Sequence, residues 1–284
     1  MLDPSKNTPP QFFVEPAAFS GDRVVLTGDV LRHALTQRLV PGQVFRVVAD
    51  LGIAGGVQLP RAVQGVQAGW HGQDALAADQ RTCHSTEVCE AEVVEATRKR
   101  LVGKIINRYY VDAPSYALHL YPAILKGDKF DLVIVKATEL GVTSITPIVT
   151  ARTIPRLDEA KKAARKARWE KVSRAAAEQS GRPNVPEVRD VISFKELMAD
   201  SVPGKALLAL ERREMTGRLD EAIGSNREVS ILIGPEGGFE ADEVGQALEK
   251  GFSPVTLGPY ILRAETASMA ACAITVEYLS RVSP

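Results

Sequence analysis

Two glycine-rich segments near the C-terminal end have the residue types of a ligand-binding site. The first, residues 230–239 (SILIGPEGGF), is an apolar stretch that leads into a glycine-rich turn and then an acidic helix start at Glu240, Asp242 and Glu243. Glycines let the backbone approach a ligand closely, but two glycines also occur in ordinary strand-to-helix turns, so this segment alone favours neither interpretation. Its spacing matches neither the dinucleotide fingerprint nor a phosphate-binding P-loop. The acidic helix start further disfavours a nucleoside triphosphate.

The second segment, residues 257–268 (LGPYILRAETAS), places three polar side chains together ahead of an apolar helix. These side chains are Arg263, Glu265 and Thr266. A surface loop with a helix cap would also explain them. Open α/β sheets bind ligands at the carboxyl ends of their strands. Two glycine loops at two strand ends, with a compact polar cluster, therefore favour a ligand site.

The elements that must position these loops alternate between strand and helix from Tyr116 onward. Apolar runs indicate strands at 117–120, 145–149, 206–210, 230–233 and 255–257, and helical patterns cover 128–140, 158–179, 194–198, 242–250 and 266–279. This alternation predicts an α/β fold with a parallel sheet covered by helices on both faces.

The N-terminal part has a different pattern. Short β-like runs occur at 11–14, 23–26, 44–48, 92–96 and 109–111. One helix is expected at 29–39, capped by Asp29, with Val30, Ala34 and Leu35 facing inward. These features predict a small β-barrel-like domain over 1–115 and a second domain over 116–284. Residues 54–86, rich in Gly, Ala and Gln, are predicted to be a loop or insertion.

Composition narrows the class of protein. The 284 residues are 45% hydrophobic and 25% charged, as in a soluble globular protein. No apolar run is long enough for a membrane helix and no signal peptide is apparent. The three cysteines, Cys83, Cys89 and Cys272, favour a reducing compartment, hence the cytoplasm. Cys83-His84 with Cys89 misses the usual zinc spacing, so no metal is predicted.

Net charge is zero, which counts mildly against a nucleic-acid partner, but the charge is unevenly distributed. Basic residues cluster between Arg98 and Arg108 and again between Arg152 and Arg174. A basic helix is usually a solvated face. Beside a ligand site, contact with nucleic-acid phosphates becomes the favoured interpretation.

Together, IGPEGGF and LGPYILRAETA resemble the RsmE family of 16S rRNA uridine-N3 methyltransferases, which belong to the SPOUT, or trefoil-knot, class. Three further stretches agree, at 32–52, 126–153 and 168–188, so the resemblance covers nearly the whole chain in order. It implies an N-terminal PUA-like β-barrel, a C-terminal trefoil-knot (SPOUT) parallel-sheet domain, S-adenosyl-L-methionine as cofactor, a homodimer, and the 16S rRNA of the 30S subunit as substrate.

The same resemblance implies roles for individual residues. Arg263 would stabilise negative charge on the uracil, and Glu265 would orient Arg263 or act as general base. For Glu265 the alternative role is a charge that interacts with the helix end. For Glu236 two roles stay open, which are catalysis and a carboxylate bonded to nearby backbone amides in a turn. The cofactor would bind Leu210, Glu211, Gly234, Pro235, Glu236, Gly237, Gly238, Leu257, Gly258, Ile261, Leu262 and Thr266. The two basic segments themselves predict RNA binding by Arg98, Lys99, Arg100, Arg152 and Lys166, and the resemblance adds Arg38 and Arg182.

The chain departs from the family pattern in its N-terminal domain. Gln11 stands before Phe12 and Phe13 where the family usually has arginine, and Leu35-Thr36-Gln37 replaces a stretch that usually has an aliphatic pair. Two other functions are compatible with the residues. One is a non-catalytic RNA-binding or ribosome-assembly protein with a vestigial pocket, and the other is a SPOUT enzyme acting on tRNA or on a ribose 2′-OH.

Overall fold

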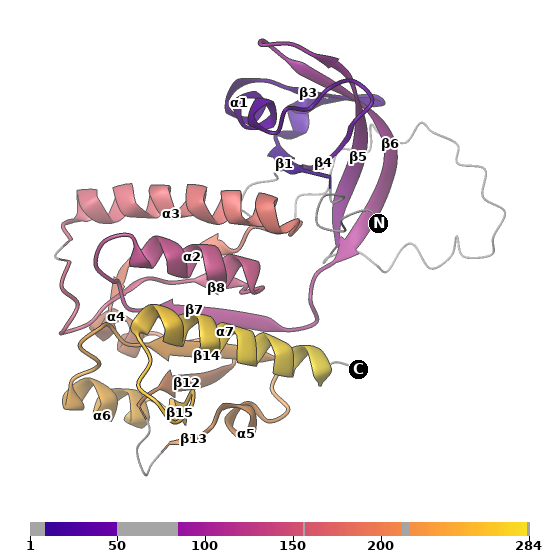
Figure 1. Ribbon diagram of the computed structural model, residues 1–284. Coiled ribbons are helices and arrows are strands. Elements are labelled where there is room, and N and C mark those ends of the chain that lie inside the picture. Colours follow the sequence, from indigo (N-terminus) through magenta and orange to yellow (C-terminus); the bar gives the residue numbers. More distant parts are fainter. Residues whose placement is uncertain (1–8, 50–84, 156, 212–215, 283–284) are drawn as a thin grey trace. The chain divides into compact units, whose positions relative to one another are not determined.

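The computed structural model describes residues 9–49, 85–155, 157–211 and 216–282, which fall into two compact units (Figure 1). The first comprises Met1–Ala113 with Gly181–Asn184, and the second comprises Pro114–Ser180 with Val185–Pro284. Most of the predicted insertion, residues 54–84, lies outside the described residues, as do Cys83 and His84. Residues 85 and 86 belong to a strand. None of the described helices has the length and apolar character needed to cross a membrane.

The first unit is built on a six-stranded sheet in the order β1-β4-β5-β6-β3-β2. The strands are β1 (Gln11–Val14), β2 (Phe19–Ser20), β3 (Arg23–Leu26), β4 (Val44–Ala49), β5 (Ser85–Ala96) and β6 (Leu101–Asp112). β1 pairs with β4 in parallel and the other pairings are antiparallel. Every strand predicted for this region is present, and the last two are parts of the long β5–β6 hairpin.

Helix α1 (Gly28–Thr36) differs from its prediction at both the cap and the buried face. Thr27, not Asp29, holds the N-cap position. Leu31 and Ala34 are buried against the core of the first unit, while Leu35 is 38% exposed. Each helical residue is rotated by about 100° from the one before. Leu35 therefore lies about 40° round the helix from Leu31 and about 100° from Ala34, at the edge of the face that these two residues share.

The second unit contains a seven-stranded, wholly parallel sheet in the order β10-β8-β7-β14-β12-β15-β13, which confirms the predicted α/β class. Its strands are β7 (Ala117–Pro122), β8 (Ser144–Ile145), β10 (Glu187–Val188), β12 (Lys205–Ala209), β13 (Gly217–Arg218), β14 (Glu228–Ile233) and β15 (Ser253–Thr256). Its helices are α2 (Lys129–Glu139), α3 (Glu159–Ser180), α4 (Phe194–Ala199), α5 (Leu219–Ile223), α6 (Ala241–Glu249) and α7 (Ala264–Arg281).

The prediction of a single strand over 145–149 is wrong, because two separate strands occupy this stretch. After β8 the chain leaves the main sheet, and β9 (Ile148–Val149) pairs instead with β11 (Ile192–Ser193). Pro147 stands at the division. Proline has no N–H to donate to a strand ladder, so it commonly stands where pairing ends.

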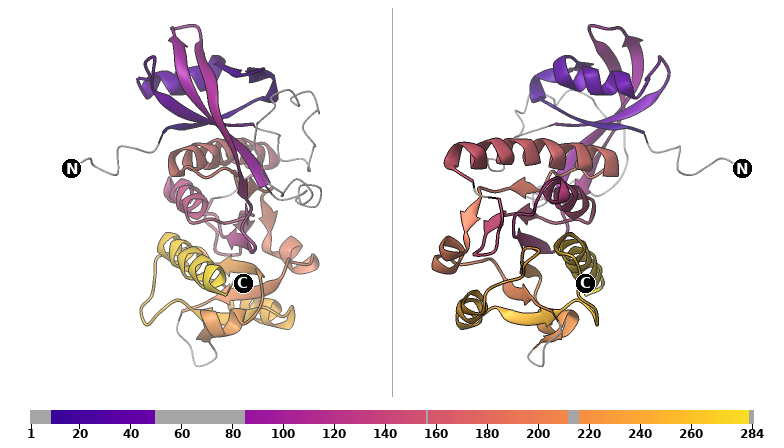
Figure 2. Two further views of the ribbon diagram at one scale, coloured as in Figure 1. Left: turned by 90° about the vertical axis from the view of Figure 1, so that its right-hand side faces the viewer. Right: turned by 60° about the vertical axis from the view of Figure 1, so that its left-hand side comes forward.

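Alternating side chains of the central strands fill two separate cores. Val229, Ile231 and Ile233 of β14 pack into one core, whereas Leu232 packs into the other. Helices α2 and α7 cover the first face and α4 and α6 cover the second (Figure 2). Because β12, β14 and β15 are parallel neighbours, their carboxyl ends meet at one edge of the sheet, where the two glycine-rich segments begin.

Candidate functional site

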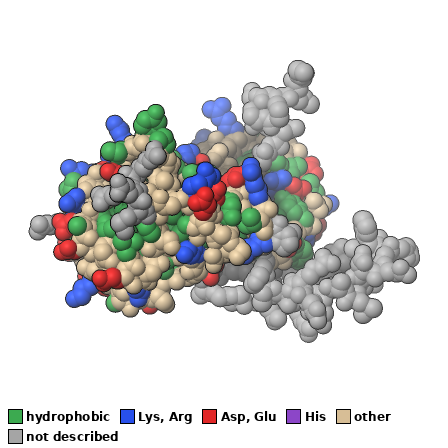
Figure 3. Space-filling model, turned by 90° about the horizontal axis from the view of Figure 1, so that it is seen from below, with side chains coloured by type: hydrophobic (Ala, Val, Ile, Leu, Met, Phe, Trp, Pro, Cys, Tyr) green, Lys and Arg blue, Asp and Glu red, His purple; other side chains and the backbone are tan. Residues whose placement is uncertain are grey.

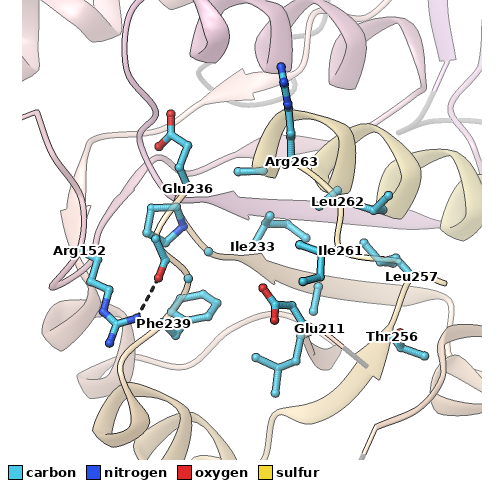
Figure 4. Close-up of a pocket in the computed structure, with 18 of the residues that line it drawn as sticks. Arg152, Glu211, Ile233, Glu236, Phe239, Thr256, Leu257, Ile261, Leu262 and Arg263 are labelled. Carbon is cyan, nitrogen blue, oxygen red and sulfur yellow. Dashed lines mark hydrogen bonds between the residues drawn. The ribbon is translucent and has the colours of Figure 1, made fainter. Parts of the chain in front are cut away.

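A cavity of about 560 Å³ opens at this edge of the sheet (Figure 4). Three loops form most of its wall, one after each of β12, β14 and β15. Two cationic side chains from elsewhere in the second unit, Lys129 and Arg152, complete the wall. The volume lies within the roughly 300–1,000 Å³ usual for small-molecule and cofactor sites.

The cavity brings together nearly all the residues predicted to bind a cofactor. Leu210 and Glu211 line it from the first loop, the segment Gly234–Gly238 from the second, and Leu257, Gly258, Ile261 and Leu262 from the third. Thr266 does not line the cavity; Ala264 and Ala267 of the same helix do.

The second loop, residues 234–239, is called the glycine loop below. The amide of Gly238 donates to the carbonyl of Pro235 at 2.9 Å, and Gly238 has a φ of +68°. A Cβ on Gly234 would lie 3.0 Å from the ring of Phe239. The tight turn needs a left-handed residue at Gly238, and close packing of the Phe239 ring needs a small one at Gly234.

The carboxylate of Glu236 is held at the cavity wall by the start of α2. Its Oε1 accepts hydrogen bonds from the Lys126 amide and from Lys129 Nζ, both at 3.3 Å. Burial acts to raise the pKa of Glu236, but hydrogen bonds from backbone amides and from Lys129 outweigh it, so the pKa lies below its usual value. Of the two roles that the sequence left open for Glu236, these hydrogen bonds favour a carboxylate that is bonded to backbone amides over a catalytic one.

Arg152 reaches the other side of the glycine loop. Its Nη1 donates to the carbonyl of Gly237 at 2.9 Å, the contact marked by a dashed line in Figure 4, and its Nε lies 3.8 Å from Glu240. The neighbouring Ala151 amide donates to Glu243 Oε1 at 2.8 Å. Glu243 is buried and also accepts from the Glu240 amide, closing a capping box at the start of α6.

The start of α7 holds the two residues predicted to be catalytic. Arg263 lines the cavity and is exposed, and its side chain extends away from the strand-end loops in Figure 4. Glu265 is only 8% exposed. Its Oε1 lies 4.0 Å from Lys129 Nζ, and its Oε2 is buried with no hydrogen-bond partner among the described residues. A buried acceptor without a donor is unusual and is often found at functional sites.

Nine lining residues were not predicted as site residues: Lys129, Ala209, Ile233, Phe239, Val244, Thr256, Tyr260, Ala264 and Ala267. Phe239 and Tyr260 fall inside the two recognised segments, and Tyr260 is 82% exposed at the cavity mouth. Lys129 lies in residues 126–153, one of the further stretches that resemble the family, but nothing in that stretch connects it to the two distant loops.

The residues predicted to bind RNA lie on several elements. Arg98, Lys99 and Arg100 are exposed in the β5–β6 turn, and Arg100 makes a two-point ion pair with Glu95. Arg38 is exposed just after α1, with a φ of +53°. The Arg182 carbonyl accepts from the Gln11 side chain at 2.8 Å, Lys166 pairs with Asp190 at 2.8 Å, and Arg152 alone lines the cavity.

Much of the positive charge of α3 is locally paired. Lys161, Lys162, Lys166 and Arg168 each contact a carboxylate, whereas Arg165 and Lys171 have no ion pair among the described residues. On the face shown in Figure 3, which looks at the molecule from below, Lys and Arg side chains are interspersed with Asp and Glu side chains. The basic helix predicted from the sequence therefore carries less free positive charge than its composition indicates.

Cysteines and metal ligands offer no second centre of chemistry in the part of the chain that the structure describes. Cys89 and Cys272 are buried free thiols, and burial raises their pKa to about 11 and about 12 respectively. Such thiols are largely protonated and unreactive at neutral pH. The described ranges contain no cluster of three or more His, Cys, Asp or Glu that could hold a metal ion.

Comparison with known proteins gives consistent matches. Residues 112–276 match the family described as RNA methyltransferase domain. The ribosomal RNA small subunit methyltransferase E of Bacillus subtilis is 32% identical over 201 residues, which cover 67% of this chain and 78% of that protein. The Mesomycoplasma hyopneumoniae protein of the same name is 35% identical over 181 residues, covering 62% and 75%.

A solved structure matches almost the full length. It is a ribosomal RNA small subunit methyltransferase E from Neisseria gonorrhoeae bound to S-adenosyl methionine, with a TM-score of 0.73 and 27% identity. The match covers 94% of this chain and 97% of that one.

Proposed function

The chain belongs to the RNA methyltransferase family that includes the ribosomal RNA small subunit methyltransferase E proteins, and from this premise we propose that it methylates N3 of a uridine in 16S rRNA with S-adenosylmethionine as methyl donor. One observation carries the proposal. The two segments that resemble the family line a single cofactor-sized cavity, in a fold shared with a relative that holds S-adenosyl methionine.

The residues present fit this cofactor. Apolar side chains such as Leu210, Leu257 and Leu262 provide a surface for the adenine, and the glycine loop exposes backbone groups to the ligand. The carboxylates of Glu211 and Glu236 suit a positively charged sulfonium compound. When bound, the cofactor supplies an electrophilic methyl group.

The chain's own residues would handle the proton and the charge. Uridine N3 must lose its proton before its electron pair can form the new N–CH₃ bond, so a base is needed. We propose Glu265 for this role: it does not line the cavity, but it lies next to the lining residue Ala264, and its buried Oε2 is an acceptor without a donor among the described residues. Arg263, exposed at the cavity mouth, donates to the uracil oxygens as negative charge develops there.

The substrate assignment has a direct test. Nucleosides in 16S rRNA are mapped by mass spectrometry in cells lacking the protein, and again after complementation. We expect one methylated uridine to disappear and return. Unchanged uridine methylation would refute the proposal. A non-catalytic protein with a vestigial pocket is tested separately by titration with S-adenosylmethionine, since such a pocket should show no affinity.

We also propose the finer features implied by the resemblance. The boundary between the two domains lies at residue 115. The second is a SPOUT domain with a trefoil knot, and the first is a PUA-like barrel that binds RNA. The enzyme is a cytoplasmic homodimer that needs no metal. Exposed apolar side chains on the second unit, Tyr260, Ile261 and Ile274, support a dimer contact. Sedimentation at several protein concentrations tests it, and a monomer throughout would contradict it.

A further inference from the structure

The glycine loop is held by residues that lie far from it in the sequence. The loop contributes six consecutive residues, 234–239, to the cavity wall, yet among the described residues only one backbone hydrogen bond lies within it, from Gly238 to Pro235. Glycine-rich backbone has many accessible conformations when free. Contacts from outside the loop must therefore select the conformation that shapes the cavity.

One such contact comes from the start of α2. Lys129 Nζ lies 3.3 Å from Glu236 and 4.0 Å from Glu265, so one ammonium group joins the glycine loop to the start of α7. The Lys126 amide adds a second donor to the same Glu236 oxygen. Because its carboxylate is occupied by these donors, Glu236 is poorly suited to accept a proton from the substrate.

A second contact comes from the chain after β9. Arg152 donates to the Gly237 carbonyl, and its aliphatic carbons pack against Gly237, where an added Cβ would lie 3.4 Å from them. The partly buried hydrogen bond from the Ala151 amide to Glu243 anchors this segment to α6. In Figure 4 the carboxylate of Glu236 points away from the glycine loop, and the side chain of Arg152 reaches toward the loop from another segment.

We propose that Lys129 and Arg152 are positioning residues that clamp the glycine loop from two sides and thereby set the affinity for S-adenosylmethionine. The inference rests on the proposed function and assigns Arg152 to the cofactor pocket instead of to RNA phosphates. Both side chains are about half exposed, at 41% and 51%, so their ion pairs add little to global stability. Their removal should loosen the loop without unfolding the protein.

The test uses the full-length variants Lys129→Met and Arg152→Met, which keep an unbranched apolar chain and lose the charge. Titration calorimetry should show S-adenosylmethionine binding weakened about 3- to 10-fold in each, the range of one ordinary hydrogen bond. In methyl-transfer assays KM for the cofactor should rise in both variants, and kcat should change little in Arg152→Met, whose side chain has no ion pair with Glu265. Lys129→Arg and Arg152→Lys should recover much of the affinity. Lys129→Met combined with Glu236→Gln should weaken binding no more than Glu236→Gln alone.

Arg189→Met is the matched control, because Arg189 has a similar exposure of 38% and an ion pair to Glu187 at 3.0 Å but does not line the cavity. It should leave cofactor binding and activity unchanged. If Arg152→Met weakened binding of 16S rRNA and left cofactor affinity intact, the assignment would be overturned. If the wild type binds S-adenosylmethionine and both Met variants bind it equally well, the proposed clamp would be overturned and the proposed function would stand. A wild type that does not bind would overturn the proposed function as well.

Discussion

The two residues proposed to be catalytic, Arg263 and Glu265 at the start of α7, differ in their exposure to solvent. Arg263 is exposed at the cavity mouth, where RNA can reach it, while Glu265 is buried beside Lys129. A general base works best where water does not compete for its acceptor oxygen, and a charge-stabilising group must reach the substrate. This division supports separate roles for the two side chains.

Replacing Arg263 with Ala should therefore remove catalysis and spare binding. We expect single-turnover methyl transfer to fall by about 10²- to 10³-fold, the usual effect of losing one donor to a developing anion. Cofactor affinity and melting temperature should stay close to the wild type because the side chain is exposed. A variant that retained substantial activity would contradict the role of Arg263.

His119 on β7 supplies a prediction about pH and stability. It is buried, its Nδ1 lies 2.7 Å from Ser144 Oγ, and its Nε2 lies 3.2 Å from Glu228. Burial lowers the pKa of His119, although Glu228 partly opposes the shift. The unfolded chain, with a histidine pKa of about 6.5, then takes up the proton first as pH falls. The free energy of unfolding should decline below about pH 6.5 and be insensitive to this residue above it.

Urea unfolding of the wild type and of His119→Gln at pH 7.5, 6 and 5 measures this effect. Glutamine keeps hydrogen-bonding groups and does not titrate, so the variant should lose less stability between pH 7.5 and 5. Equal losses in both proteins would show that His119 does not titrate differently on folding.

At the scale of elements, the contact between β12 and β14 depends on one glycine. Gly204 precedes β12 with a φ of +64°, and a Cβ there would lie 2.0 Å from the carbonyl oxygen of Glu228 at the start of β14. Gly204→Ala should lower the free energy of unfolding by roughly 2–4 kcal/mol, because either the strands separate or the backbone is strained.

Gly245→Ala in α6 is the comparison, because an added Cβ meets nothing within 4 Å and alanine favours a helix. It should raise stability by up to about 1 kcal/mol. Urea denaturation of the two variants distinguishes a steric effect from a general effect of removing glycine. Equal stability of Gly204→Ala and wild type would refute the close approach.

The β5–β6 turn is the element on which proposed RNA contact can be tested most simply. Arg98 and Lys99 are exposed and have no ion pair among the described residues, whereas Arg100 is paired with Glu95. Removing both unpaired charges should weaken 16S rRNA binding and reduce the slope of log K against log salt by about 0.7–0.9 per lost phosphate contact. Arg100→Ala should have a smaller effect, and none of these changes should alter cofactor affinity. A salt slope unchanged by the double substitution would exclude this turn from the interface.

Local pattern was sufficient to predict most of these elements but not all of them. Apolar runs located β12, β14 and β15 to within two residues, because a buried parallel strand is a short continuous apolar stretch. The short α5 was not predicted, since five residues give little periodicity. The strand over 145–149 was predicted as one, because its apolar run obscured the break at Pro147.

The residues of the site likewise fall into those that local pattern could predict and those that it could not. The glycine loop and the loop after β15 are continuous in the sequence, so their residues could be predicted together. Lys129 and Arg152 meet the glycine loop across separations of 107 and 85 residues. Such contacts depend on the order of strands in the sheet, which no local pattern specifies. Arg152 was accordingly predicted from its charge alone, as an RNA ligand.

At the scale of the whole molecule, the two units have separate hydrophobic cores. One core is built around Phe12 and Phe45, and the other unit contains two cores on the two faces of its parallel sheet. The residues that line the cavity all belong to the second unit. A ligand bound in this cavity therefore contacts, and directly stabilises, the second unit.

Cofactor binding should consequently stabilise the two units unequally. A ligand that binds only the native state adds RT ln(1 + [L]/Kd), or about 2.7 kcal/mol at a concentration of 100 Kd. We expect hydrogen exchange, followed by mass spectrometry, to slow in β14, the glycine loop and the start of α7 as S-adenosylmethionine is added. Exchange in β1, β4 and the β5–β6 hairpin should change little, because those amides open through a different core. Uniform slowing across both units would instead mean that the molecule opens as one cooperative body, and the cofactor would then stabilise the first unit as strongly as the second.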